Sequence, residues 1–357
     1  MDSLTQVTLG AAVGEACIGR KAGHKAWLWG AVLGTLPDLD ILAYPFMKIV
    51  AFTEFHRGVT HSLIFILPLS IALAYLFPAL HPKLALSRFR WGLFAFLALI
   101  THVLLDCFTT WGTEVFWPLK TSIAWETIFV IDPLYTLLLL IPLILAIFKK
   151  KTEQKRKRWI QIGLIASSCY LLLTLVNKVY MHSTFSNALE SGPHLEEFRT
   201  RPTPLNNFLW SGIARTSKDD YLIGYHTLLD PASPLRFRRI KGKHELLNGL
   251  RHHANVKGLI EISEGYYSVR KGKNGNIRFY DLRFGELFFW NPQRTRPVFC
   301  YLIEPRKEGA PRIERKEGAA KIQEGDLWTF MKRVSNGVRI GKPAASYLPP
   351  ENGSAIE

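Results

Sequence analysis

Two histidines in a short polar loop are the residues best suited to chemistry in this sequence. His56 and His61 lie in the stretch His-Arg-Gly-Val-Thr-His-Ser, between long apolar runs, and the glycine favours a turn that directs both imidazoles into one site. Carboxylates lie on both sides in sequence, with Asp38 and Asp40 upstream and Asp106 downstream. We expect these groups to converge and to bind one or two divalent metal ions.

His102 and Asp106 form the second pair. They are four residues apart, so on a helix they share one face and can ligate the same ion or orient one another. The alternative is a packed histidine followed by an acidic helix cap, and Pro37-Asp38-Leu39-Asp40 is likewise a good turn sequence. Ionisable groups are costly inside membrane segments and usually have a functional reason there, which favours the metal site.

The mixture of imidazole and carboxylate donors indicates the metal and its chemistry. It suits zinc, manganese or iron better than calcium, which prefers all-oxygen ligation. Such a site activates water near neutral pH, so hydrolysis is the expected reaction. We assign His56, His61, His102, Asp38, Asp40 and Asp106 as metal ligands, and Arg57, Thr60 and Asp132 as catalytic residues. Arg57 and Thr60 would hold an anionic substrate oxygen, whereas Asp132 would act as an auxiliary ligand, a general base or a helix cap.

Apolar runs must position these groups. They cover residues 5–19, 27–36, 63–80, 91–108, 129–148 and 159–176. The first run is short for a full span and rich in glycine and alanine, which let membrane helices approach closely. The sequence therefore predicts an α-helical membrane bundle of five to six apolar segments in residues 1–177.

Basic clusters predict how this bundle is oriented. They lie at residues 20–25, 83–90 and 149–158, and in the last cluster seven of ten residues are Lys or Arg. If each run crosses or turns back, all three clusters fall on the cytoplasmic side and all candidate ligands on the other. The net charge of +16 then reflects membrane topology, so nucleic acid is not an expected partner.

The chain changes character after residue 177. Residues 178–335 alternate apolar and polar positions between glycine-containing turns, which predicts a smaller β-rich (α+β) domain outside the membrane. The count of apolar runs before it places this domain on the extracytoplasmic side. Ser268–Arg270, Ile277–Arg283 and Leu287–Trp290 are its clearest strands, with a hairpin turn at residues 273–276. Residues 336–357 have the composition of a disordered tail.

The motifs together resemble a known family. The opening Met-Asp-Ser-Leu-Thr-Gln-Val-Thr-Leu-Gly, the Pro37–Asp40 turn, the 56–62 loop, His-Val-Leu-Leu-Asp at 102–106 and Asp-Pro-Leu at 132–134 are similar to those of the YdjM/YbcI-type membrane-bound metal-dependent hydrolases, also described as LexA-binding inner-membrane-associated hydrolases. Residues 202–210 and 280–283 resemble the C-terminal part of longer members.

The resemblance implies a multi-pass protein of the bacterial inner membrane, with a distant likeness to zinc-dependent phospholipase C. One position departs from the pattern, because members commonly have Thr-His where this chain has Thr5-Gln6. Glutamine is a poorer zinc ligand than imidazole, so the departure puts a two-metal mechanism in doubt more than metal binding itself.

The sequence therefore predicts a metal-dependent hydrolase of an ester or phosphoester, acting through a metal-activated water. Its expected partners are membrane lipid and a small-molecule or lipid-linked substrate, and protein partners are left open. Two other classes use the same residues: an ion or proton transporter with intramembrane His and Asp, and a non-catalytic membrane anchor with a structural metal.

Overall fold

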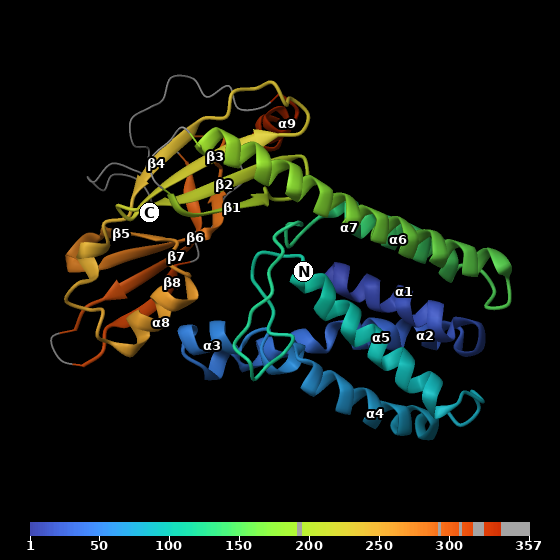
Figure 1. Ribbon diagram of the computed structural model, residues 1–357. Coiled ribbons are helices and arrows are strands. Elements are labelled where there is room, and N and C mark those ends of the chain that lie inside the picture. Colours follow the sequence, from blue (N-terminus) through green and yellow to red (C-terminus); the bar gives the residue numbers. More distant parts are fainter. Residues whose placement is uncertain (191–194, 292–293, 307–308, 317–324, 337–357) are drawn as a thin grey trace. The chain divides into compact units, whose positions relative to one another are not determined.

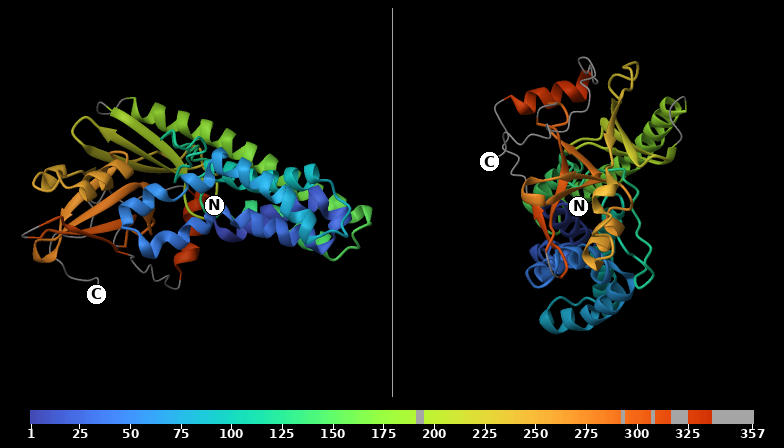
Figure 2. Two further views of the ribbon diagram at one scale, coloured as in Figure 1. Left: turned by 90° about the horizontal axis from the view of Figure 1, so that it is seen from below. Right: turned by 90° about the vertical axis from the view of Figure 1, so that its left-hand side faces the viewer.

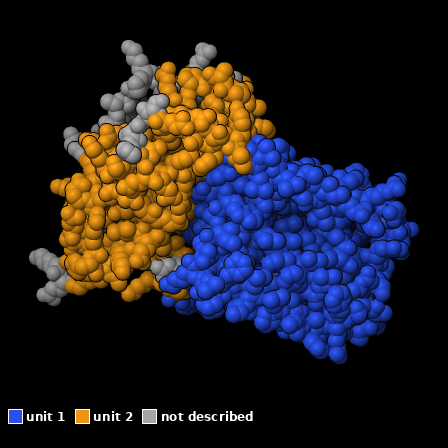
Figure 3. All heavy atoms as spheres, viewed as in Figure 1, with its two compact units in different colours: residues 1–46, 54–178, 204–207 blue, residues 47–53, 179–203, 208–357 orange. Residues whose placement is uncertain are grey.

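The computed structural model describes residues 1–190, 195–291, 294–306, 309–316 and 325–336. The chain divides into two compact units (Figure 3). Unit 1 comprises Met1–Phe46, Glu54–Lys178 and Pro204–Asn207, and unit 2 comprises Met47–Thr53, Val179–Thr203 and Phe208–Glu357. The disordered tail was predicted for residues 336–357; Asn336 is instead the last residue of a helix, and residues 337–357 lie outside the described residues.

Unit 1 is helical, and the candidate site residues come from its helices and the connections between them (Figure 1). Its main helices are α1 (Ser3–Ala22), α2 (His24–Thr35), α4 (Leu63–Leu80), α5 (Arg88–Cys107), α6 (Pro133–Ile147) and the first part of α7 (Gln154–Leu189). Shorter elements join α2 to α4: the 3-10 helix η1 (Pro37–Phe46), α3 (Ile49–Phe55) and the 3-10 helix η2 (Val59–His61).

Glycines fix the close approach of α1 and α2. A Cβ placed on Gly10 would lie 2.2 Å from the Gly30 carbonyl oxygen and 2.7 Å from the Gly34 Cα. A Cβ on Gly14 would lie 2.3 Å from the Ala26 carbonyl oxygen. Only glycine tolerates such backbone contact, so the small residues of the first apolar run form the packing surface for α2.

The predicted count of five to six apolar segments is not confirmed. Among the described residues, three helices are long and apolar enough to cross a membrane: α4, α5 and α7. The apolar helix α6 is shorter, at 15 residues. About 20 residues are needed to cross the hydrocarbon layer, which is why the 12-residue α2 also falls short.

The three basic clusters lie at one end of the helices. Lys21 Nζ donates to the Ala85 carbonyl oxygen at 3.0 Å, and Lys151 Nζ lies 3.5 Å from the Lys21 carbonyl oxygen. Arg156 and Glu15 form a buried bidentate salt bridge, in which Nε donates to Oε1 at 2.7 Å and Nη2 donates to Oε2 at 2.8 Å. These contacts join the α1–α2, α4–α5 and α6–α7 connections. His61, before α4, and Asp106, near the end of α5, therefore belong to the opposite end.

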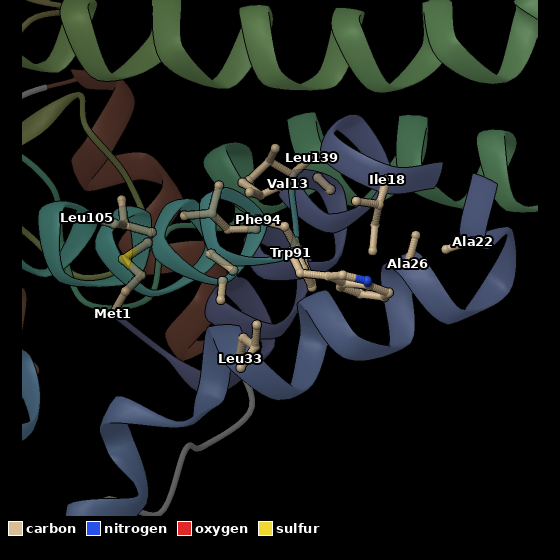
Figure 4. Packing of buried hydrophobic residues seen from close by; sticks show 14 of the residues in the cluster. Met1, Val13, Ile18, Ala22, Ala26, Leu33, Trp91, Phe94, Leu105 and Leu139 are labelled. Carbon is tan, nitrogen blue, oxygen red and sulfur yellow. The ribbon is translucent and has the colours of Figure 1, made fainter. Parts of the chain in front are cut away.

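The core of unit 1 lies between α1, α2, α5 and α6 (Figure 4). Trp91, Phe94 and Leu33 are fully or almost fully buried there, and Leu139 contributes from α6. Figure 4 also shows Met1 beside Leu105 at the end of α5. Packing of α5 against α1 and α2 thus fixes the helix that carries His102 and Asp106.

The described part of unit 2 contains two antiparallel sheets, each of four strands in sequence order. The first sheet comprises β1 (Leu195–Pro202), β2 (Leu209–Thr216), β3 (Asp220–Thr227) and β4 (Phe237–Lys241). The second comprises β5 (Tyr267–Lys271), β6 (Ile277–Leu287), β7 (Arg296–Glu304) and β8 (Arg312–Lys316). The chain is thus a helical N-terminal region followed by a two-sheet β region.

Helices and apolar side chains cover these sheets. Ile213 and Ile223 of the first sheet cluster with Leu282 of the second, and Phe330 of α9 (Asp326–Asn336) joins them. Helix α8 (Ala254–Ile262), preceded by the 3-10 helix η3 (His244–Leu247), packs on the second sheet. The green helix α7 runs unbroken from residue 154 to 189 (Figure 2), and its Phe185 ring occupies the space above Gly212.

The predicted hairpin is confirmed. Strands β5 and β6 pair antiparallel around the short 3-10 turn η4 (Lys273–Gly275), in which Asn274 has φ 58°. The strand predicted at Leu287–Trp290 is wrong, because β6 ends at Leu287 and the next three residues form a turn with Phe288 at φ 52°. Apolar periodicity did not separate this buried aromatic turn from a strand.

Candidate metal site

Four predicted ligands converge at one point in unit 1. They are Asp38 from η1, His61 from η2, and His102 and Asp106 from α5, and one donor atom from each lies within 4.8 Å of the other three. The side chains of His61, His102 and Asp106 are 0–1% exposed, whereas that of Asp38 is 19% exposed. The i, i+4 spacing on α5 places His102 and Asp106 on one face, as predicted.

The hydrogen bonds of the two buried rings define which nitrogen faces the cluster. His102 Nδ1 lies 2.6 Å from the Gly34 carbonyl oxygen, which can only accept, so Nδ1 carries the proton. Thr60 Oγ1 donates to Asp40 Oδ2 at 3.2 Å and lies 3.0 Å from His61 Nδ1. Because a hydroxyl has one proton to donate, His61 Nδ1 must in turn donate to Thr60. Each ring therefore presents Nε2 to the cluster.

These two Nε2 atoms are 3.2 Å apart. In neutral rings with protonated Nδ1 atoms, both Nε2 atoms carry lone pairs, which repel at this distance unless a proton or a metal ion lies between them. Burial disfavours a charged His61 ring, but attraction to the carboxylates of Asp106 and Asp38 outweighs it and raises the pKa of His61. The cluster therefore favours a cation at its centre.

The spacing of the donor atoms can be compared with that of a four-coordinate ion. His61 Nε2 lies 3.4 Å from Asp38 Oδ1 and 3.5 Å from Asp106 Oδ2, and His102 Nε2 lies 3.5 and 3.7 Å from the same two oxygens. A tetrahedral zinc ion with bonds of about 2.0–2.2 Å requires donor-to-donor distances of about 3.3–3.6 Å. The donor set therefore fits tetrahedral zinc without large rearrangement.

Asp106 has the most crowded surroundings. Its Oδ1 accepts from the amine of Met1 and, at 3.0 Å, from Gln6 Nε2. Its Oδ2 lies 3.1 Å from Arg57 Nε, although the angle is unsuitable for a hydrogen bond. Oδ2 is thus a buried carboxylate oxygen without a hydrogen bond among the described residues, which leaves its lone pairs directed at His61 and His102.

A second group consists of Asp38, Asp40 and His56, so the two groups share Asp38. Asp40 Oδ1 lies 2.9 Å from His56 Nδ1, and Oδ2 accepts from the backbone N–H of Arg57 at 3.1 Å. Burial alone would raise the pKa of Asp40, but the His56 ring and the Arg57 amide outweigh it and lower this pKa. Asp40 is therefore an ionised carboxylate held by several donors.

Arg57 occupies a strained position next to the cluster. Its φ is 64°, in the left-handed region, and its side chain is 6% exposed. Its Nη1 donates to Thr109 Oγ1 at 2.9 Å, and its carbonyl oxygen accepts from the Glu114 amide at 3.0 Å. The connection between α5 and α6 thus holds Arg57 in place.

Asp132 belongs to neither of the two ligand groups. It is the N-cap of α6, where its carboxylate accepts from the Tyr135 amide at 3.0 Å and from the Tyr170 hydroxyl at 2.9 Å. These bonds match the helix-cap alternative. Its assigned catalytic role stays a prediction.

Three groups around the site were not assigned from the sequence. They are the Gly34 carbonyl, the Gln6 amide and the Met1 amine. In the sequence, Gln6 stands out only as a departure from the family pattern. A backbone carbonyl carries no side-chain signal, so the Gly34 contact could only be found from the packing of α2 against α5.

Comparison with known proteins agrees with these motifs. The N-terminal half matches a family model described as YdjM inner membrane protein, over residues 1–181. The inner membrane protein YbcI of Escherichia coli (strain K12) is 35% identical over 111 residues, which is 28% of this chain and 60% of YbcI. The alignment thus spans less than two thirds of that relative. No solved structure matches the chain.

The matched residues include both buried histidines, both flanking carboxylates and the helices that position them. The family resemblance expected from the motifs is confirmed. The family model covers about half of the sequence, and the chain therefore belongs to the YdjM inner membrane protein family.

Proposed function

We propose that this inner membrane protein is a metal-dependent hydrolase that acts on an ester or phosphoester, with a lipid-linked substrate as the preferred class. The observation that carries the proposal is the pair of Nε2 atoms of His61 and His102, 3.2 Å apart and flanked by two carboxylate oxygens at tetrahedral spacing. The helices α4, α5 and α7, which are long and apolar enough to cross a membrane, would bring such a site to lipid.

In this proposal His61, His102, Asp38 and Asp106 would hold zinc. The bound ion would polarise the ester or phosphoryl oxygen and make water a better nucleophile near neutral pH. Within the two ligand groups, Asp38 and His56 are the partly exposed side chains, at 19% and 18%, so the substrate would approach over them. On the side of α1 and α2, the fully buried Gln6 and the Gly34 carbonyl contact the ligands Asp106 and His102.

The other residues would orient the ligands or neutralise charge. Arg57 places a guanidinium beside Asp106, where its positive charge favours an anionic substrate oxygen. Thr60 uses its hydroxyl to connect Asp40 with His61, so we assign it to orienting His61 instead of binding substrate. Arg57 would thus supply a positive charge beside the metal ligands while the carboxylates of Asp40 and Asp106 stay buried.

A structural metal is the second candidate, and one observation favours it. The group of Asp38, His61, His102 and Asp106, called the inner group below, offers four protein donors, which is the number that fills a structural zinc site. Catalysis needs one coordination position for water or substrate. Asp38, the most exposed donor, is the ligand whose displacement would open such a position.

The test begins with metal content. Detergent-purified wild-type protein is compared with His61→Ala, Asp106→Ala and the control His24→Ala, which alters an exposed histidine of the same unit at the basic end. We expect bound zinc in wild type and control and little in the other two variants. Unchanged zinc in His61→Ala and Asp106→Ala would contradict the site.

Activity is then measured on a chromogenic phosphodiester, a carboxylic ester and phospholipid vesicles, before and after chelation and zinc restoration. Hydrolysis that follows zinc content across the variants supports the hydrolase. Zinc bound at full occupancy with no zinc-dependent hydrolysis of any of these probes would favour the structural role.

A further inference from the structure

We infer that this protein binds a single metal ion and that Asp40 is a positioning residue, not a ligand of a second ion. The inference rests on the proposed metal site and deepens it. The sequence pattern allowed one or two ions, and the group Asp38, Asp40 and His56 is the one that would hold a second. Hydrogen bonding and charge around Asp40 decide between the two arrangements.

Both oxygens of Asp40 are already occupied by donors. Oδ1 accepts from His56 Nδ1 at 2.9 Å, and Oδ2 accepts from the Arg57 amide at 3.1 Å and the Thr60 hydroxyl at 3.2 Å. The Arg57 amide cannot easily turn away, because its residue is fixed in a left-handed conformation and by the Glu114 amide. A metal ion at Asp40 would have to displace these donors.

The proposed ligands of the inner group show the opposite pattern. Asp106 Oδ2 is buried and has no hydrogen bond from any residue that the structure describes, and Asp38 Oδ1 lies 3.4–3.5 Å from the two imidazole Nε2 atoms. These oxygens have lone pairs directed at the centre of the group. Asp38 therefore has an oxygen directed at the proposed metal position, whereas both oxygens of Asp40 already accept hydrogen bonds, although the two residues are only two apart in the same turn.

Asp40 orients both histidines of the 56–62 loop. It accepts directly from His56 Nδ1 and, through the Thr60 hydroxyl, fixes His61 with its proton on Nδ1. A carboxylate that accepts from the distal nitrogen of a metal-bound imidazole sets the ring orientation and raises its basicity. Asp40 would thus strengthen the binding of an ion that it does not touch.

The charge balance also favours one ion. The three carboxylates of Asp38, Asp40 and Asp106 balance one divalent ion together with the Arg57 guanidinium, which contacts Asp106. A second divalent ion would leave two excess positive charges at side chains that are at most 19% exposed. Uncompensated buried charge is strongly unfavourable.

Zinc stoichiometry and affinity test the inference without an activity assay. The full chain in detergent is loaded with zinc, and bound metal is counted per chain in wild type, Asp38→Asn, Asp40→Asn and His56→Gln. Affinity is measured by competition with a chelator. Thr60→Val is a second variant that breaks the link to His61 while leaving every carboxylate in place, and helical circular dichroism confirms folding of each variant.

We expect one zinc per chain in wild type, Asp40→Asn, Thr60→Val and His56→Gln, and loss of zinc in Asp38→Asn. Affinity should fall by about 10–100-fold in Asp40→Asn, as for loss of other partners of metal-bound histidines, and also in Thr60→Val. Cobalt-substituted protein should show a four-coordinate spectrum without spin coupling between ions.

Two ions per wild-type chain, or one lost in His56→Gln or Asp40→Asn, would overturn the single-ion inference while leaving the metal site intact. Unchanged affinity in both Asp40→Asn and Thr60→Val would overturn the positioning role. If wild-type protein binds no zinc, the proposed function itself fails, and the inference fails with it.

Discussion

Replacing Gly10 by alanine should weaken metal binding although Gly10 contacts no ligand. The new Cβ would lie 2.2 Å from the Gly30 carbonyl oxygen, whereas ordinary contact begins at 3.4 Å, so α1 and α2 must separate locally by about 1.2 Å. Helix α2 ends beside Gly34, whose carbonyl oxygen accepts from His102 Nδ1 at 2.6 Å. A shift of this size would stretch or break that hydrogen bond.

The expected magnitudes follow from these contacts. Overpacking costs about 1–3 kcal/mol, and alanine in a helix returns at most about 1 kcal/mol relative to glycine, so Gly10→Ala should be less stable overall. Loss of a hydrogen-bonding partner of a metal-bound histidine should weaken zinc binding by about 10–100-fold.

The assay is chelator competition for zinc, with thermal unfolding of the zinc-free protein measured beside it. Gly249→Ala serves as the control, because nothing lies within 4 Å of a Cβ at that position. Zinc affinity within twofold of wild type, together with unchanged thermal unfolding, would refute the argument that glycine contacts between α1 and α2 position His102.

Three further predictions concern the site. Because the pKa of His61 is raised, zinc binding should release a proton, and zinc affinity should increase as pH rises from about 6.5, the usual value, through the raised pKa. Calorimetry in buffers of different ionisation enthalpy would detect the released proton. A zinc affinity that does not depend on pH would contradict this prediction. In the zinc-free protein, the stabilisation from protonated His61 should be complete below about pH 6.5 and should be lost as pH rises through the raised pKa. Thermal unfolding measured at several pH values tests this. A zinc-free protein that becomes more stable over this pH range would contradict the prediction. Arg57→Gln removes a positive charge 3.1 Å from Asp106 Oδ2, so zinc affinity should rise by about tenfold or more, whereas hydrolysis of an anionic substrate should fall; weaker zinc binding in this variant would mean that Arg57 mainly supports the fold.

The sequence predicted much of the site because its spacing was informative. His102 and Asp106 are four apart, which placed them on one face of a helix, and an acidic turn with a glycine-containing loop supplied Asp38 and His61. What the sequence did not reveal was the difference between Asp38 and Asp40. Both belong to one motif, and only the three-dimensional contacts separate an oxygen facing two imidazoles from one held by Arg57 and Thr60.

The fold was harder to predict where an apolar run could either cross a membrane or pack against another helix or a sheet. The runs at residues 5–19 and 27–36 resembled short spans, but glycine contacts pair them as α1 and α2, neither of which is among the helices suited to crossing a membrane. The last apolar run ends near residue 176, yet α7 continues to Leu189 because Met181 and Phe185 pack on the first sheet. Hydropathy shows where an apolar run ends, but a helix can continue beyond that point.

The route of the chain limits how this protein can be dissected. Residues 47–53 belong to unit 2 although residues on both sides belong to unit 1, and residues 204–207 return to unit 1, where Asn207 Nδ2 donates to the Thr127 carbonyl oxygen at 2.7 Å. A cut after Lys178 would divide α7 and strip unit 1 of Asn207, while the excised remainder would lack Ile49 and Val50 of its own core. Neither unit is an uninterrupted stretch of sequence, so no single truncation yields an intact half.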